Sequence, residues 1–495
     1  MTRLRPSNPQ YRTNNTLFIL TGGPGQSGWT FVSLAALLFP DTYGITFILP
    51  DHRGCGLSSP LACDDNGSQN ITAACIPYLI SRWGSEGLKQ FSITAAAHDI
   101  AVQIQYYQSI FPGRVAIYGV SYGTIWLDRF LQIYPNLVQS AIMDSVVNPL
   151  LFSVSQYDLW PSSIAMRFLA YCQFQIECNQ HFPVDEPPHF MLSRLLRELD
   201  GNKQNCANNY LSKYQLTAEK LRNILSRLVG SSEQYFDSTV IPAIIFLLNR
   251  CNEEDVTALK FFFETSFKLE EITNEVNPPP LLVSLVLGFH ITQSELWLAL
   301  DQDEVDNVTI LAWHKSTIIA GKIDFKYTSL RSQWPKYPLD QYRNKVASYS
   351  PVLMLSGQFD TAAPLDYAVQ LLSLTGKTRT LYTFPLVGHV IIVMAAFEFT
   401  CPIHLIYSWA FPDLFPPEWS NSTCIQDFPT KIDFVGATEP GQLFSLKYLN
   451  MSKPFGNSTS TSLPNSSIHL TYSFELMIYC ALIFLTIFTR ETVYH

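Results

Sequence analysis

The feature that most constrains the fold is an alternation of short apolar runs with helical segments in the first 150 residues. Each apolar run has the length of a buried strand and is bounded by glycine, proline, polar or charged residues. Strands alternating with helices form right-handed βαβ units, so the pattern predicts a parallel sheet covered by helices. The expected strands are 16–20, 44–49, 114–118 and 138–143, and the expected helices are 30–39, 94–111 and 124–134.

This alternation is interrupted in the middle of the chain. Residues 150–340 have mostly helical patterns, broken by prolines at 187–188 and 278–280. Strand patterns return at 352–356 and 380–384. The sequence therefore predicts an α/β protein in which a large helical lid is inserted between the two halves of one mostly parallel sheet.

Composition along the chain adds a linker and a tail. The predicted segments are a first half of the core at 1–149, the lid at 150–340, a second half of the core at 341–435, a Ser/Thr/Asn-rich linker at 436–474 and a hydrophobic tail at 475–495. Residues 476–489 carry no charge, although they are fewer than the roughly 20 residues that span a bilayer. We expect a membrane anchor here; a processed GPI signal and a buried helix are the alternatives.

Composition also excludes several classes of protein. A content of 47% hydrophobic and 15% charged residues excludes disorder over most of the chain. A net charge of −9 without a Lys/Arg cluster predicts no nucleic-acid partner, because phosphate repels an acidic chain. Other apolar runs, such as 281–289, are too short for a polytopic membrane protein.

The ten cysteines and eight N-x-Ser/Thr sequons indicate an oxidising, secretory or extracellular environment. Several cysteines lie in closely spaced pairs that suit disulfide-closed loops, although spacing does not fix the connectivity. The predicted disulfides are Cys63–Cys75, Cys172–Cys178, Cys206–Cys251 and Cys401–Cys424, which leaves Cys55 and Cys480 unpaired. Neither C-x-x-C nor H-E-x-x-H occurs, so we predict no metal site and no cofactor.

Residues 119–123 (GVSYG) form a G-x-S-x-G motif between an expected strand and an expected helix. A serine on such a sharp turn is lifted above the sheet, and small flanking residues avoid clashes there. The context predicts that Ser121 is a nucleophile. A plain strand-to-helix turn is the alternative.

Two further residues complete a possible catalytic triad. Asp360 follows the expected strand 352–356, and His389 follows the expected strand 380–384. A serine hydroxyl is a poor nucleophile at neutral pH, so His389 would accept its proton and Asp360 would orient the imidazole. Considered by itself, Asp360 would be interpreted as the cap of a loop, and His389 as a histidine on the surface. Together with Ser121, in this order and at strand ends, they predict a Ser-His-Asp triad.

The glycine-rich run at 21–25 (TGGPG) follows the first expected strand. Glycines let backbone amides approach a substrate closely, so we expect the amides of Gly23 and Tyr122 to form an oxyanion hole. The overlapping run 23–28 (GPGQSG) also satisfies G-x-G-x-x-G, and Asp51 ends the next strand. That combination suggests an NAD-binding oxidoreductase, but it leaves Ser121 without a role.

Taken in order, the runs TGGPG, DHRGCGLSSP, GVSYGT, SGQFDTAAP and VGH resemble the serine peptidases of the prolyl iminopeptidase and tripeptidyl aminopeptidase group. The resemblance covers about residues 16–150 and 345–430. Cys401 and Cys424 resemble part of the C-terminal module of the tripeptidyl-aminopeptidase-like branch.

The resemblance implies an α/β-hydrolase fold and a serine exopeptidase that acts on short peptides with a free N-terminus. It assigns Ser121 as nucleophile, Asp360 as acid and His389 as base. Such an enzyme needs an anion for the α-ammonium of its substrate, for which we expect Glu295 at the end of the lid.

The sequence departs from this pattern near its start. Thr21 replaces the usual histidine of HGGPG, which should be tolerated because backbone amides do the binding. Only about fifteen residues precede the first expected strand, and residues 1–16 contain no apolar stretch of a signal peptide. We therefore expect the N-terminus to be shortened.

Two functions other than a peptidase remain open beside the oxidoreductase. An esterase or lipase would use the same fold and triad, and would cleave esters but not peptide amides. A non-catalytic binding protein on a hydrolase scaffold would keep the fold, and its serine would not react with a fluorophosphonate.

Overall fold

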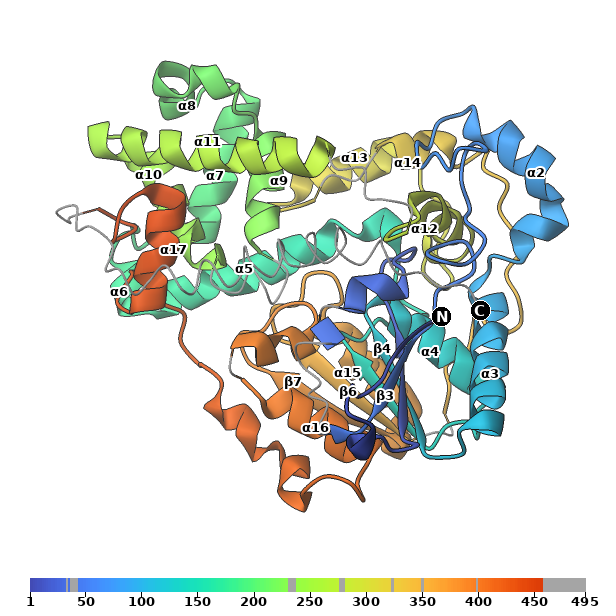
Figure 1. Ribbon diagram of the computed structural model, residues 1–495. Coiled ribbons are helices and arrows are strands. Elements are labelled where there is room, and N and C mark those ends of the chain that lie inside the picture. The colour runs from blue at the N-terminus through green and yellow to red at the C-terminus, as the bar shows by residue number, and fades with distance from the viewer. Residues whose placement is uncertain are drawn as a thin grey trace.

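The computed structural model describes residues 1–32, 34–35, 43–229, 237–275, 281–321, 325–348, 351–397 and 399–456. Within these residues, seven strands form one sheet in the order β1-β3-β2-β4-β5-β6-β7 (Figure 1). The strands are β1 (Thr2–Leu4), β2 (Thr16–Leu20), β3 (Thr46–Leu49), β4 (Val115–Val120), β5 (Ser140–Asp144), β6 (Val352–Gly357) and β7 (Arg379–Phe384). Strand β1 is antiparallel to β3, and the remaining neighbours are parallel.

The helical insertion enters between two neighbouring strands of the sheet. Strands β5 and β6 pair directly, with Ala141 opposite Val352, although the whole helical region separates them in sequence. The predicted α/β-hydrolase fold, a mostly parallel sheet flanked by helices, is confirmed.

Two layers of helices cover the sheet because alternate strand residues point to opposite faces. One face packs against α3 (Ile93–Ile110), α4 (Tyr122–Ile133) and α15 (Leu365–Thr375), and the other packs against α16 (Cys401–Ala410). Helix α3 begins at Ser92, whose hydroxyl accepts a hydrogen bond from the Ala95 amide. Its buried residues recur every three or four positions, as a helix with one core-facing side requires.

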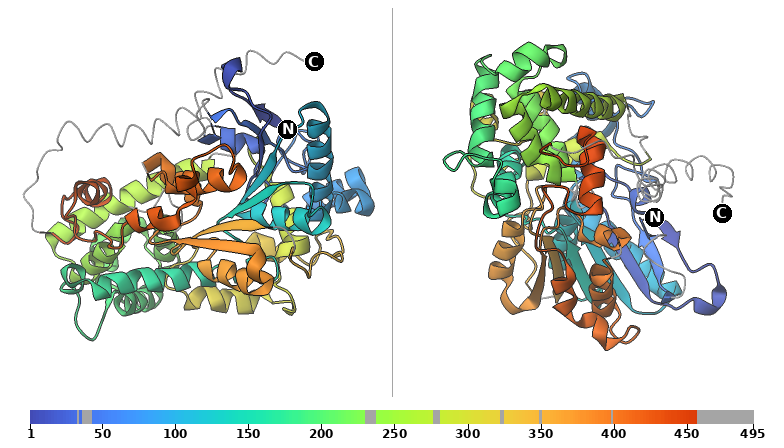
Figure 2. Two further views of the ribbon diagram at one scale, coloured as in Figure 1. Left: turned by 90° about the horizontal axis from the view of Figure 1, so that it is seen from below. Right: turned by 90° about the vertical axis from the view of Figure 1, so that its left-hand side faces the viewer.

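The lid helices lie together on one side of the sheet (Figures 1 and 2). They enclose a hydrophobic core of their own. The longer helices of the lid are α5 (Leu159–Phe174), α7 (Pro188–Asp200), α9 (Ala218–Leu228), α10 (Ile241–Arg250) and α11 (Glu253–Glu275). The chain then returns to the sheet side at α12 (Leu285–Ile291), where Val286, Leu287 and Phe289 join the core above α3 and α4.

Residues after the second half of the core also belong to the lid. Helix α17 (Glu439–Leu449) packs against α11, and both Tyr448 and Leu449 are buried in the lid core. Phe455 then stacks on His181 with ring centroids 3.9 Å apart. The predicted linker at 436–474 is therefore wrong over residues 439–456. The polar residues around 450–456 concealed Met451 and Phe455, which pack in the lid.

The rest of the predicted linker and the predicted tail at 475–495 lie outside the described residues. In the described part of the chain, no helix is both long and apolar enough to cross a membrane. Of the helix expected at 30–39, the structure shows a 3-10 turn at Gly28–Phe31, and residues 36–39 lie outside the described residues.

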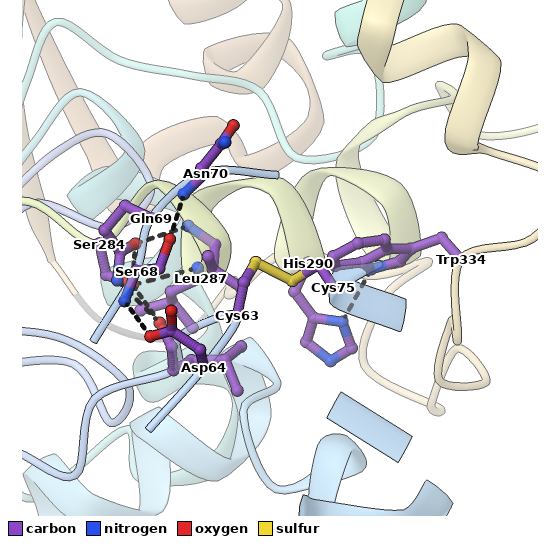
Figure 3. Close-up of a disulfide and its surroundings, with 12 residues drawn as sticks. Cys63, Asp64, Ser68, Gln69, Asn70, Cys75, Ser284, Leu287, His290 and Trp334 are labelled. Carbon is purple, nitrogen blue, oxygen red and sulfur yellow. Dashed lines mark hydrogen bonds between the residues drawn. A yellow bond between two sulfur atoms is a disulfide. The ribbon is translucent and has the colours of Figure 1, made fainter. Parts of the chain in front are cut away.

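All four predicted disulfides are present. Cys55 is a buried free thiol, and Cys480 lies outside the described residues. The Cys63–Cys75 loop contacts the start of α12, where the Gln69 side chain accepts a hydrogen bond from the Val286 amide (Figure 3). This disulfide therefore lies where the first half of the core meets the returning lid segment.

His290 of α12 is a structural histidine. Trp334 donates its indole N–H to His290 Nδ1 at 3.1 Å, and the other ring nitrogen lies 3.0 Å from the Leu88 carbonyl oxygen (Figure 3). Burial lowers the pKa of His290 to about 4, so the ring is neutral and both of its nitrogens are hydrogen-bonded.

Candidate active site

Ser121 lies on a sharp turn between β4 and α4. Its backbone has φ 57° and ψ −125°, a conformation that L-residues rarely adopt. The flanking glycines leave no room for a side chain, because a Cβ at Gly119 would lie 2.5 Å from the Gly123 carbonyl oxygen. A Cβ at Gly123 would lie 2.2 Å from the Leu20 carbonyl oxygen. Packing therefore accounts for the small residues of G-x-S-x-G.

The three predicted triad residues meet at the carboxyl edge of the sheet. His389 Nε2 lies 2.9 Å from Ser121 Oγ, and His389 Nδ1 lies 2.9 Å from both carboxylate oxygens of Asp360. Asp360 follows β6 and is fully buried. Its Oδ1 also accepts hydrogen bonds from the amides of Ala362 and Ala363. The three residues thus form one continuous chain of hydrogen bonds, from Ser121 through His389 to Asp360.

The surroundings of His389 favour its protonated form. Burial lowers its pKa, but the charge and hydrogen bond of Asp360 together with the charge of Asp144 outweigh burial and raise the pKa above the usual 6.5. Because Asp360 accepts a hydrogen bond at Nδ1, the neutral ring carries its proton there and leaves Nε2 free to accept the Ser121 proton.

This raised pKa predicts a pH dependence for the reaction. A general base must be unprotonated in the free enzyme, so kcat/KM should fall as the pH drops through the pKa of His389. We expect the midpoint of this acid limb to lie above 6.5, measured as kcat/KM between pH 5 and 9 at constant ionic strength. A midpoint below 6 would show that Asp360 and Asp144 do not outweigh burial.

The glycine-rich loop at 22–25 lies beside the nucleophile. A Cβ added to Gly22 would lie 3.1 Å from the Ser121 Cβ, and Gly23 has a φ of 111° that favours glycine. Tyr122 is the first residue of α4, so its amide has no partner within that helix. The structure thus brings the Gly23 loop and the Tyr122 backbone to the same side of Ser121.

The contacts of the glycine-rich loop contradict the dinucleotide-binding interpretation. Asp51 accepts hydrogen bonds from the amides of Gly28 and Leu57 at 2.8 and 2.9 Å, so its carboxylate holds its own loops together. The backbone of the lid covers the loop, because a Cβ at Gly25 would lie 2.3 Å from the Ser284 carbonyl oxygen. The lid backbone therefore occupies the space over Gly25, which a dinucleotide-binding loop would leave open for the pyrophosphate.

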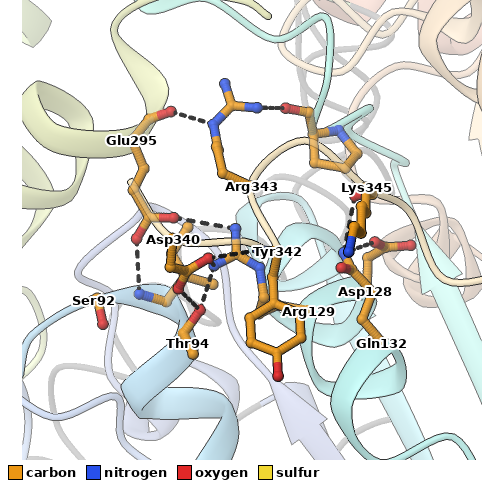
Figure 4. Close-up of polar contacts among 12 residues, drawn as sticks. Ser92, Thr94, Asp128, Arg129, Gln132, Glu295, Asp340, Tyr342, Arg343 and Lys345 are labelled. Carbon is orange, nitrogen blue, oxygen red and sulfur yellow. Dashed lines mark hydrogen bonds and ion pairs between the residues drawn. The ribbon is translucent and has the colours of Figure 1, made fainter. Parts of the chain in front are cut away.

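Glu295 does not present a free carboxylate, contrary to the role expected from the resemblance. It lies on the π-helical turn Thr292–Leu296 and is 5% exposed. Its Oε2 pairs with Arg129 at 3.2 Å (Figure 4). Its Oε1 accepts hydrogen bonds from the Ile93 amide and the Tyr337 hydroxyl. Sequence alone did not show that a buried cation of α4 pairs with this carboxylate.

Arg129 offered a signal that could have corrected this prediction. It lies in α4 among apolar residues and is 2% exposed, and a buried arginine requires a carboxylate partner. Besides Glu295, it contacts the side chains of Thr94 and Asp340 (Figure 4). The Glu295–Arg129 pair thus ties the lid to the helix that begins at the nucleophile.

In the described part of the chain, neither a reactive thiol nor a metal centre accompanies the triad. Burial raises the pKa of Cys55 to about 12, so its thiol is not a ready nucleophile. The described residues contain no group of three or more His, Cys, Asp or Glu side chains that could hold a metal ion.

Comparisons with known proteins agree with this architecture. Residues 15–223 match a family model described as alpha/beta hydrolase fold. The order and direction of the strands, together with this match, show that the chain has the α/β-hydrolase fold.

No curated protein matches the sequence. Among solved structures, a proline iminopeptidase from Mycobacterium smegmatis shares 15% identity over 83% of this chain and 95% of its own, with a TM-score of 0.37. A monoacylglycerol lipase from Paleococcus ferrophilus shares 12% identity over 79% and 90%, with a TM-score of 0.31. A thermophilic esterase from Thermogutta terrifontis shares 13% identity over 83% and 99%, with a TM-score of 0.33.

Proposed function

We propose that this protein is a serine exopeptidase that releases residues from short peptides with a free N-terminus. The observation that carries the catalytic part of the proposal is the hydrogen-bond chain from Ser121 through His389 to Asp360.

In this mechanism, His389 takes the proton of Ser121 while the serine oxygen attacks the carbonyl carbon of the scissile bond. The amides of Gly23 and Tyr122 would donate to the resulting oxyanion, each contributing on the order of 3 kcal/mol in the transition state. Protonated His389 then gives its proton to the leaving amine, which leaves an acyl group on Ser121. A water molecule, activated by the same histidine, releases the acyl group and restores the enzyme.

Two features favour a peptide substrate of limited size. The runs TGGPG, DHRGCGLSSP and GVSYGT resemble those of aminopeptidases. Gly22 of the first run lies beside Ser121, and His52 of the second packs against the Tyr122 ring. The lid lies directly on the glycine-rich loop, where a Cβ at Gly288 would be 2.5 Å from the Pro24 carbonyl oxygen. A lid in this position restricts access from the side of α12.

An esterase is the second candidate, and one observation favours it. The carboxylate expected to bind the substrate ammonium, Glu295, is neutralised by Arg129. A site without a free anion would select an uncharged acyl group.

The two candidates are separated by matched substrates. The same short acyl chain is presented as an anilide with a free amino end, as the N-acetylated anilide, and as the corresponding p-nitrophenyl ester. We expect the free anilide to be cleaved with at least a tenfold higher kcat/KM than the acetylated one. Turnover of the ester alone would establish the esterase, and failure of Ser121 to react with a fluorophosphonate would exclude both.

We also propose that the protein works in the secretory pathway or outside the cell. Four disulfides in the described residues support this environment, because thiols remain reduced in the cytosol. Membrane attachment through the hydrophobic segment 475–495 is part of the same proposal.

A further inference from the structure

Near His389 lies a second buried carboxylate that the triad does not use. Asp144 ends β5 and is fully buried. Its Oδ1 accepts a hydrogen bond from the Ile391 amide at 2.8 Å, and its Oδ2 accepts one from the Ile392 amide at 2.9 Å. In the part of the chain that the structure describes, no lysine or arginine forms an ion pair with it. Burying a carboxylate without a cation costs free energy, so a functional role for Asp144 is worth testing.

Ser145, the residue after Asp144, binds the backbone amide of Val390. Ser145 has a left-handed φ of 55°, and its hydroxyl accepts a hydrogen bond from the Val390 amide at 2.7 Å. Val390 itself has a φ of 69°, which is a strained conformation for a β-branched residue. The three backbone amides that follow His389 therefore all donate hydrogen bonds to the side chains of Asp144 and Ser145.

The backbone at the end of β5 also holds the nucleophile. The Ser121 amide donates to the Asp144 carbonyl oxygen at 2.9 Å, and the Ser145 amide donates to the Leu355 carbonyl oxygen of β6 at 2.9 Å. The Tyr118 hydroxyl of β4 completes the contacts by donating to Asp144 Oδ2 at 2.6 Å. Both sides of the Ser121–His389 hydrogen bond are thus fixed to the end of β5.

We propose that Asp144 and Ser145 are positioning residues that keep His389 at bonding distance from Ser121, and that the negative charge of Asp144 assists proton transfer to the imidazole. This inference rests on the proposed serine-hydrolase function. Sequence reasoning missed Asp144, although a charged residue ending an apolar strand is the same signal that pointed to Asp360.

The pH at which kcat/KM falls depends on the charges around His389. A purely structural role of Asp144 would leave this pH unchanged. Asp360 and Asp144 are the two carboxylates that raise its pKa. Burial raises the pKa of Asp144 above its usual value, and the hydrogen bonds from Tyr118 and the two amides offset only part of that rise. Removing the Asp144 charge should therefore move the acid limb of kcat/KM to lower pH.

The test is Asp144→Asn in the full chain, with rates expressed per site titrated by a fluorophosphonate. Asparagine cannot accept both amide hydrogen bonds and the phenol, so the His389 loop should shift. We expect kcat per titrated site to fall about 10- to 100-fold, with KM within about twofold of its original value. The acid limb should move below its wild-type midpoint.

Two further variants keep the inference falsifiable. Asp255→Asn removes another fully buried carboxylate, which pairs with Arg250 in the lid, and should leave the rate per titrated site and the acid limb unchanged. Ser145→Ala frees the Val390 amide without changing charge, and should lower kcat per titrated site about three- to tenfold with an unmoved acid limb. This variant carries the test if Asp144→Asn does not fold.

Rates per titrated site within twofold of wild type for both Ser145→Ala and any folded Asp144→Asn would overturn the positioning role. If Ser121→Ala kept its activity, the proposed function would fail instead, so the two failures are distinguishable.

Discussion

Replacing Ser121 by alanine should reduce hydrolysis by on the order of 10⁶-fold, because the nucleophile of the acyl-enzyme step is lost. Stability should change by less than about 1 kcal/mol, since the change removes one partly exposed hydroxyl and its hydrogen bond to His389. The measurements are kcat on the preferred peptide or ester, fluorophosphonate labelling, and urea unfolding.

The matched control is Ser373→Ala. Ser373 lies on α15, and its exposed hydroxyl donates to the Gln370 carbonyl oxygen, so this variant should keep full activity and labelling. Residual hydrolysis above about 1% in a Ser121→Ala preparation free of contaminating enzyme would rule out Ser121 as the nucleophile.

Glu295→Gln should lower the free energy of unfolding by about 3 kcal/mol, because Arg129 would remain buried beside a neutral amide. Asp340 lies 3.5 Å from Arg129 and is partly exposed, so it compensates only part of the lost charge. We expect the KM ratio of free to N-acetylated peptides to stay within about twofold, since the carboxylate is occupied by protein groups. Urea unfolding and the two KM values provide the measurements.

Glu304→Gln is the control for this prediction. Glu304 also pairs with an arginine, Arg331, but its side chain is 55% exposed, so its loss should cost less than about 1 kcal/mol. A tenfold rise in KM for free-amino peptides in Glu295→Gln, with unchanged stability, would restore the ammonium-binding role that the resemblance implied.

The strands of the sheet could be predicted because their pattern is local. Strand β2 has the predicted bounds 16–20, and β4 to β7 begin and end within two residues of their predicted bounds. Buried strands in a parallel sheet are apolar throughout, and glycine or proline ends them. Strand β1 (Thr2–Leu4) was missed because three residues at the edge of a sheet carry too little pattern.

The triad could also be anticipated, because each of its residues follows a strand and parallel strands end at the same edge of a sheet. The contacts of Glu295 could not be predicted from the sequence. Its partner Arg129 lies 166 positions away in sequence, and no local pattern records which charges meet after folding.

The sequence by itself determined most strands of the sheet, the helices at 94–111 and 124–134, and which side chains are chemically able to act as nucleophile, base and acid. Only the tertiary structure decided that Glu295 is neutralised, that Asp144 and Ser145 support His389, and that α17 packs in the lid. The physical reason is that periodicity and turn chemistry depend on neighbours along the chain. Charge pairing, burial and hydrogen-bond satisfaction depend on residues that meet only in the folded protein.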